Sequence, residues 1–254
     1  MNVVDVKTLV RFCDELLHSD EFGDYCPNGL QIDAATPVSK LITGVTACQA
    51  LIDEAIRQNA QAILVHHGYF WKGESPTLTG FKGKRIRTLL QNNISLIAYH
   101  LPLDAHPTLG NNALLADALD LSITKALHPQ EKHPIGNIAT CQPISAQAFA
   151  NKIHAVLQRA PVHIGNNPDK LLSCVALCTG AAQDMLEQAH LMGCDAFISG
   201  EISERTTHIA RELGIDYFGA GHHATEKAGI RALGNVLADT FGIQVSFVDI
   251  DNPV

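Results

Sequence analysis

Short apolar runs that end in polar residues recur along the chain and alternate with segments of helical periodicity. The run at 62–65 is followed by His66, His67 and Gly68. A short apolar run that stops at a turn residue is typical of a buried strand. Similar runs predict strands at 41–47, 94–99, 135–141, 171–178, 195–199, 215–218 and 244–250. Strands that alternate with helices indicate an α/β fold.

The segments between these strands place apolar residues at helical spacing. They predict helices at 5–18, 49–59, 110–119, 145–158, 185–192, 202–213 and 222–240. Residues 68–87 show no such spacing and predict a long loop, and long loops in compact domains are often functional.

The two halves of the sequence resemble each other at an offset of 134 residues, which aligns Gln49 with Gln183 and His67 with Glu201. Each half runs as helix, strand, polar strand end and helix. We therefore expect a duplicated α/β unit, with a first repeat over 1–125 and a second over 126–254.

Three predicted strand ends lead into residues that bind metals. His66 and His67 follow one strand, Asp104 follows another, and His222 and Glu226 lie four residues apart at a predicted helix start. Ligands of open α/β sheets bind at the carboxyl ends of the strands, and imidazole is the commonest protein metal ligand. Alternatively, these are separate loop and helix-start residues.

Three imidazoles and two carboxylates exceed the roughly three protein ligands of a single catalytic ion. They fit two divalent ions per chain, and nitrogen and oxygen ligands suit Zn, Fe, Mn, Co or Ni. His100 and Glu201 are expected to support the site by orienting a ligand imidazole.

The predicted loop at 68–87 is rich in cations and aromatic residues. Lys72, Lys84 and Arg85 could pair with the phosphates of a small anionic substrate. The aromatic residues Phe70 and Trp71 could stack on a heterocycle. The alternatives are a solvated loop and helix start for the cations, and core packing for the aromatic residues.

The composition excludes several classes of protein. The chain has 254 residues, of which 46% are hydrophobic, so it is long and apolar enough for a folded core. A net charge of −8 argues against nucleic-acid binding. No run approaches a membrane span and no signal peptide is apparent, so we expect a cytoplasmic protein without a membrane partner.

Several motifs in combination resemble a known family over nearly the whole chain. They are DYCPNGLQ at 24–31, VHHGYFWKGE at 65–74, HLPLDAHPTLGNN at 100–112 and GHHATEKAGIRAL at 221–233. They are similar to the GTP cyclohydrolase 1 type 2 homologues, also called NIF-three-like proteins, in their short bacterial, YbgI-like form.

The resemblance implies a fold, an assembly and a site. The implied fold has two intertwined, duplicated α/β domains with mixed β-sheets and a metal site in the cleft between them. The implied assembly is a toroidal homohexamer. The implied dinuclear site consists of five ligands: His66, His67, Asp104, His222 and Glu226. The family name implies hydrolytic opening of the guanine imidazole ring.

Three functional hypotheses follow. The first is a metal-dependent hydrolase that acts on a nucleotide or related heterocycle. The second is a non-enzymatic metal-handling or regulatory protein. The third is a ring around nucleic acid, against which the net charge of −8 argues. An open coordination position would favour the first hypothesis, and a saturated site would favour the second.

Overall fold

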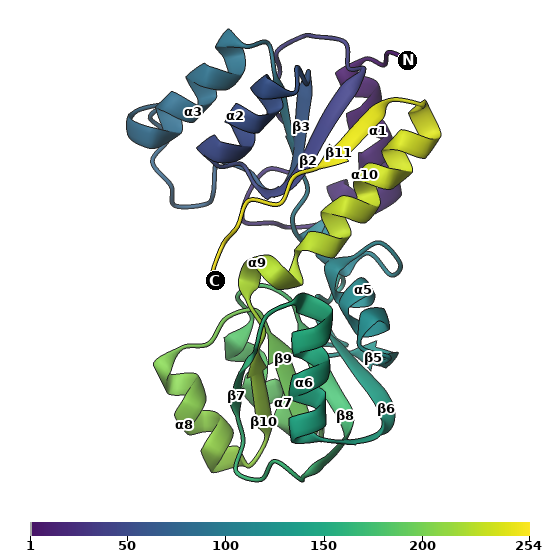
Figure 1. The fold of residues 1–254 in the computed structure, drawn as a ribbon, viewed down its shortest axis with the longest axis vertical. Coiled ribbons are helices and arrows are strands. Elements are labelled where there is room, and N and C mark those ends of the chain that lie inside the picture. The colour runs from purple at the N-terminus through teal and green to yellow at the C-terminus, as the bar shows by residue number, and fades with distance from the viewer. Residues whose placement is uncertain (1) are drawn as a thin grey trace. The chain divides into compact units, whose positions relative to one another are not determined.

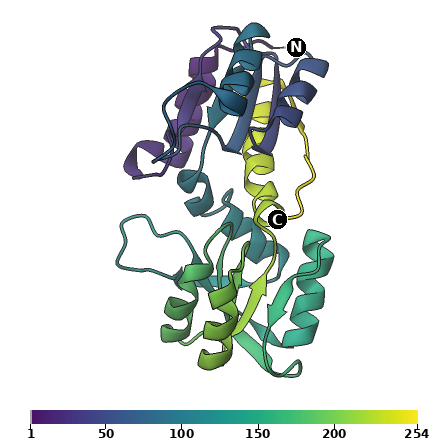
Figure 2. The same cartoon turned by 90° about the vertical axis from the view of Figure 1, so that its left-hand side faces the viewer.

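Residues 2–254 are described by a computed structural model, and they form two mixed β-sheets with helices on both faces of each sheet (Figures 1 and 2). The chain divides into two compact units. Unit 1 contains the residues up to Leu103 and Gly229–Asp251, and unit 2 contains Asp104–Ala228 and Asn252–Val254. The predicted α/β fold with mixed sheets is confirmed.

The sheet of unit 1 has the strand order β1-β4-β3-β2-β11. Its strands are β1 (Gly29–Ile32), β2 (Lys40–Thr46), β3 (Ala62–His67), β4 (Ser95–Ala98) and β11 (Gln244–Phe247). All neighbours are parallel except β1, which pairs with β4 in the antiparallel direction. The carboxyl ends of β2, β3 and β4 therefore meet at one edge of the sheet.

Helices cover both faces of this sheet. They are α1 (Val6–Leu17), α2 (Gln49–Arg57), α3 (Gly80–Gln91), α4 (Leu101–Ala105) and α10 (Lys227–Phe241), with a short 3₁₀ helix η1 (Ser19–Glu21). Figure 1 shows α1 and α10 on one face, and α2 and α3 on the other. On strand β3, Leu64 packs in the core beneath α1 and α10, whereas Ile63 and Val65 pack in the core beneath α2 and α3. Each such fully buried side chain stabilises the fold by about 1.5–3 kcal/mol.

The sheet of unit 2 has the order β5-β6-β8-β9-β10-β7. Its strands are β5 (Ser122–Ala126), β6 (Asn137–Ser145), β7 (Val162–Ile164), β8 (Leu171–Cys178), β9 (Ala196–Ser199) and β10 (Asp216–Gly219). Strands β8, β9 and β10 are parallel, and β7 runs antiparallel to β10. Its helices are α5 (Asn111–Ala118), α6 (Ala146–Leu157), α7 (Leu186–Leu191), α8 (Glu204–Leu213) and α9 (His222–Thr225), with the 3₁₀ helix η2 (Gln183–Met185).

The two sheets repeat one arrangement. Each sheet contains three adjacent parallel strands, β2-β3-β4 or β8-β9-β10. An antiparallel strand lies beside the last of the three, β1 beside β4 and β7 beside β10. A hydrogen-bonded brace also recurs. Gln61 Oε1 accepts from the backbone and hydroxyl of Ser39, each at 3.0 Å. Asp195 Oδ2 accepts from the same two groups of Ser173, at 2.8 and 3.1 Å. Both pairs lie 134 positions apart in sequence, which is consistent with duplication.

Two sequence expectations need correction. The predicted loop at 68–87 ends at Thr79, because helix α3 begins at Gly80 and contains the cations Lys84 and Arg85. The single helix predicted at 222–240 is two helices, α9 and α10, which are separated by Glu226 with φ −112° and ψ 8°.

Three strands were not predicted from the sequence. Strands β1, β5 and β7 contain only four, five and three residues, and β5 is largely exposed, so their apolar periodicity is weak. The division into sequence repeats at 125/126 stays a prediction. No helix among residues 2–254 is long and apolar enough to span a bilayer.

The end of β3 is held by the side chain of Gln31. Its Oε1 accepts from Tyr69 N at 2.7 Å, and its Nε2 donates to the Tyr69 carbonyl at 3.1 Å. A Cβ at Gly68 would lie 2.2 Å from Gln31 Oε1. The amide therefore occupies the space that any other residue at position 68 would need.

We expect Gly68→Ala and Gln31→Ala each to lower the free energy of unfolding by about 1–3 kcal/mol, through a clash and through lost hydrogen bonds respectively. The double variant should lose clearly less than the sum, because alanine at position 31 admits the new Cβ. Urea unfolding of metal-free protein tests this, with Gly23→Ala as a neutral control since nothing lies within 4 Å there. Strict additivity would contradict the packing argument.

Candidate metal centre

Strand β3 ends in two histidines whose rings are both held at Nδ1. His66 is fully buried, and its Nδ1 lies 2.9 Å from the Tyr99 carbonyl oxygen. His67 Nδ1 lies 3.2 Å from the hydroxyl of Thr46, its register partner on β2. A carbonyl only accepts, so His66 donates from Nδ1 and its Nε2 has the lone pair that a metal requires.

A third imidazole of unit 1, that of His100, lies close to this pair. The ring centroids of His100 and His66 are 5.1 Å apart, and those of His100 and Trp71 are 5.0 Å apart. His66, His67 and His100 each offer a ring nitrogen, and these nitrogens lie within 4.8 Å of one another. Unit 1 alone therefore contains a group of imidazoles that could hold a metal ion.

The position of His100 is fixed by Asp24, which comes from the DYCPNGLQ motif. His100 Nδ1 lies 2.7 Å from Asp24 Oδ1, and Asn28 Nδ2 donates to the other carboxylate oxygen at 2.9 Å. Burial raises the pKa of Asp24, but the hydrogen bond and charge of His100, together with hydrogen bonds from Asn28 and the Tyr25 backbone, outweigh burial and hold the pKa below its ordinary value. Asp24 is therefore an ionised partner for the His100 ring.

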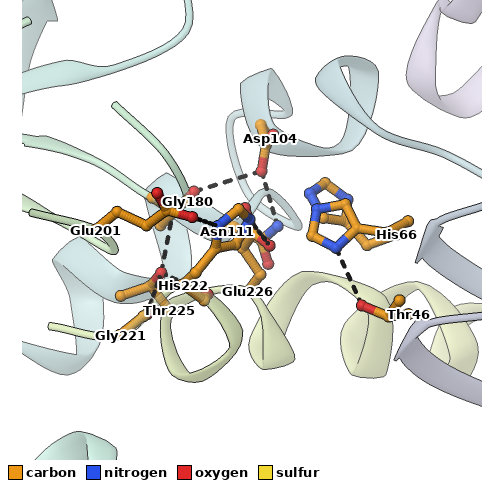
Figure 3. Close-up of polar contacts among 12 residues, drawn as sticks. Thr46, His66, Asp104, Asn111, Gly180, Glu201, Gly221, His222, Thr225 and Glu226 are labelled. Carbon is orange, nitrogen blue, oxygen red and sulfur yellow. Dashed lines mark hydrogen bonds and ion pairs between the residues drawn. The ribbon is translucent and has the colours of Figure 1, made fainter. Parts of the chain in front are cut away.

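Unit 2 provides a carboxylate–imidazole–carboxylate chain. His222 Nδ1 lies 2.7 Å from Glu201 Oε1, and His222 Nε2 lies 3.1 Å from Glu226 Oε2. Glu226 is only 2% exposed. A Cβ at Gly180 would lie 2.3 Å from Glu226 Oε1, and glycine also permits the φ of +68° found there. Gly180 thus leaves room for the carboxylate (Figure 3).

Asp104 is also a buried carboxylate of unit 2. Its Oδ1 accepts from Asn111 Nδ2 at 2.8 Å (Figure 3) and from Thr179 Oγ1 at 3.4 Å. Thr179 N in turn donates to Asn112 at 2.9 Å. Residues from the start of α5 and the end of β8 therefore orient this carboxylate.

The donor atoms fit divalent metal ions. Each of the three histidines predicted as ligands is held at Nδ1 by an oxygen atom: a carbonyl for His66, a hydroxyl for His67 and a carboxylate for His222. This second hydrogen bond is typical of metal-binding histidines, because it fixes the tautomer and the ring orientation. The space that Gly180 leaves for Glu226, and the burial of the Asp104 and Glu226 carboxylates, are also consistent with metal binding.

The predicted substrate residues lie in different settings. Lys72 is exposed in the segment that follows His67, and its backbone N donates to Tyr25 at 2.6 Å. Lys84 is exposed on α3, and the Arg85 guanidinium lies 5.1 Å from the ring centre of Phe81. Lys84 and Arg85 are therefore helix residues, not loop residues.

Sequence reasoning missed the residues that hold the rings. Thr46, Tyr99 and Asp24 each contact a histidine that is distant in sequence. The DYCPNGLQ motif was visible, but its local signal was that of a turn. Glu201 could be found from the sequence, because the alignment of the two repeats places it opposite His67.

The fold and these donor groups define a two-unit α/β protein with candidate metal-binding residues at its strand ends. The profile of the Duf34/NIF3 (NGG1p interacting factor 3) family matches residues 4–253, and the chain belongs to this family.

Curated relatives support this assignment at full length. A Vibrio cholerae protein named GTP cyclohydrolase 1 type 2 homolog is 52% identical, and all of both chains is covered. The Escherichia coli K12 protein of the same name is 47% identical, with 96% of this chain and 98% of that protein covered.

Solved structures give the same result. The protein ybgI, titled as of unknown function, has a TM-score of 0.94 at 45% identity and covers 99% of this chain and 100% of its own. TTHA1606 from Thermus thermophilus has a TM-score of 0.88 at 31% identity with the same coverage. The expected family and fold are thus confirmed.

The two glutamates make His222 unusually basic in metal-free protein. Burial lowers the pKa of His222, but the hydrogen bonds and charges of Glu226 and Glu201 outweigh this effect and raise the pKa from 6.5 to about 9. A raised folded-state pKa stabilises the fold fully below the unfolded value and loses that effect as pH rises through the folded value.

Metal-free protein should therefore lose on the order of 2 kcal/mol of unfolding free energy between pH 6.5 and pH 9 through His222. Glu201→Gln should shrink this loss, because one of the two carboxylates is gone. Urea unfolding across this pH range in chelator measures both. Glu204→Gln is the control, since it alters the exposed pair with His208. If the unfolding free energies of wild type and Glu201→Gln depended on pH identically, Glu201 would not raise the pKa of His222.

Proposed function

We propose that this chain is a dinuclear metal-binding protein. The proposed ligands of two divalent ions are His66, His67, Asp104, His222 and Glu226. The observation that carries the proposal is the oxygen partner at Nδ1 of each of the three histidines, which presents Nε2 as the ligand atom. Zn, Fe, Mn, Co and Ni all suit such nitrogen and oxygen ligands.

We propose further that the protein is a metal-dependent hydrolase of a nucleotide or related heterocycle. The curated relatives share the name GTP cyclohydrolase 1 type 2 homolog. Two divalent ions held by the five proposed ligands would supply Lewis acidity for hydrolysis. Around them, Glu201 orients His222, and Asp24 holds a proton at Nδ1 of His100. His100 would then exchange protons with the substrate through Nε2.

A non-enzymatic metal-handling or regulatory role is the second candidate. It is favoured by the third imidazole, because the nitrogens of His66, His67 and His100 lie within 4.8 Å of one another. If His100 also bound the ion, these nitrogens would fill positions that a substrate needs. A metabolite screen on fully metallated protein separates the two roles.

The family resemblance also implies a toroidal homohexamer, which we retain as a proposal. Light scattering at micromolar concentration tests it directly, and a monomer would refute it.

The ligand assignment predicts the metal content. Wild type should bind two divalent ions per chain, and His66→Ala combined with His67→Ala should remove most of the bound metal while the protein stays folded. Elemental analysis after purification without chelators or nickel resin measures this. His154→Ala with His190→Ala is the matched control, because both histidines are exposed on helices α6 and α7. Full metal retention in the first double variant would defeat the assignment.

The substrate proposal predicts a role for the exposed cations. Lys72→Ala with Lys84→Ala should raise KM for an anionic substrate, because one lost charge-assisted hydrogen bond costs about 1.5–3 kcal/mol. Metal content and melting temperature should not change. Lys7→Ala with Lys125→Ala controls for the general loss of positive charge. Kinetics within twofold of wild type would show that these lysines do not bind the substrate.

A further inference from the structure

We propose that Arg159 and the C-terminal residues Asn252–Val254 position helix α9, and through it set the metal affinity of His222. This inference rests on the proposed metal centre. Arg159, helix α9 and Asn252–Val254 all belong to unit 2.

Helix α9 is too short to be stable without contacts from the rest of unit 2. It contains only the four residues His222–Thr225, and its N-cap Gly221 provides no side-chain hydrogen bond. A helix this short gains little from its own backbone, since the first turn is the costly step of helix formation. The direction of the His222 ring therefore depends on contacts from outside the helix.

The C-terminal residues supply one of these contacts. His223 N, at the first turn of α9, donates to the main-chain oxygen of Val254 at 3.0 Å. The N–H groups of a helix start need such acceptors from outside the helix. Val254 N is itself held by Asn252 Oδ1 at 3.0 Å, so the last three residues form an ordered turn over the helix start.

Arg159 holds this turn against Gly221. Its Nη1 donates to the Pro253 carbonyl at 2.5 Å. A Cβ at Gly221 would lie only 2.8 Å from Arg159 Nη1 and 2.9 Å from its Cδ and Nε. The guanidinium therefore packs directly on backbone that only glycine leaves open, and Gly221 also has φ +100°.

The backbone of Gly200 limits α9 from another direction. Gly221 N donates to the Gly200 carbonyl at 2.8 Å, and a Cβ at Gly200 would lie 2.7 Å from His222 Cα. Two sets of contacts therefore fix the start of α9. One is the hydrogen bond from Gly221 to Gly200, and the other consists of the contacts with Arg159 and the C-terminal turn. Loss of the latter would free His222 to leave its partners Glu201 and Glu226.

The test compares Arg159→Gln, a chain ending at Asp251, and the two changes combined. We expect each to weaken one of the two metal-binding steps about 10–100-fold, as for other residues that orient metal ligands. The combination should be no worse than the stronger single change, because both remove one clamp. Competition titration of Co²⁺ against a chromophoric chelator measures the affinity, and the Co²⁺ absorption spectrum reports the ligand geometry.

The controls separate positioning from general destabilisation. Arg205→Gln removes an exposed arginine of unit 2 that pairs with Asp184, and it should bind Co²⁺ as wild type does. Arg159→Lys can still donate to Pro253 and should recover part of the affinity. Metal-free Arg159→Gln should melt within a few degrees of wild type. Wild-type affinity and spectrum in both Arg159→Gln and the shortened chain would overturn the inference.

If wild type binds fewer than two ions, the proposed function is wrong. Hydrogen exchange of the His223 amide then still tests whether Arg159 positions α9. The amide should exchange at least tenfold faster in metal-free Arg159→Gln than in wild type. The Asp216 amide, which donates to the Asp195 carbonyl in the sheet of unit 2, serves as the internal reference. Unchanged exchange at His223 would show that Arg159 does not position α9.

Discussion

The hydrogen bond between His66 Nδ1 and the Tyr99 carbonyl is the interaction on which the candidate site most depends. It joins the end of β3 to the residue that follows β4, and it fixes both the tautomer and the rotation of a fully buried ring. Neighbouring residues of a strand point to opposite faces, so His66 and His67 can serve one site only where the strand ends. Tyr99 and Thr46 stabilise that end from the strands on either side.

Duplication is consistent with the presence of candidate metal donors in both units. The repeated brace at Gln61 and Asp195 fixes the starts of equivalent parallel strands, so equivalent strand ends are presented in each unit. The side chains at those ends then differ. In unit 1, His67 is hydrogen-bonded to Thr46. In unit 2, Glu201 aligns with His67 and Gly180 aligns with Thr46. One repeat thus supplies imidazole where the other supplies a carboxylate and an open space.

The sequence revealed the elements but not the partners. Strand β3 and its histidines were predictable, because a buried run ending in polar residues is a local signal. Tyr99 and Asp24 were not, since each contacts a histidine 33 or 76 positions away through the sheet or through a loop. The break at Glu226 was also missed. The spacing of apolar residues continues through Glu226, so nothing local in the sequence indicated that α9 and α10 are separate.

The charge of the proposed centre bears on its substrate. Two divalent ions bound by three neutral imidazoles and two carboxylates would leave about two positive charges in a chain whose net charge is −8. Such a centre attracts an anionic ligand without help from surface lysines. Lys72 closely follows the proposed ligands His66 and His67, whereas Lys84 and Arg85 belong to helix α3. Ions bound in the proposed site would therefore be its principal anion-binding element, and the lysines would only add to their electrostatic field.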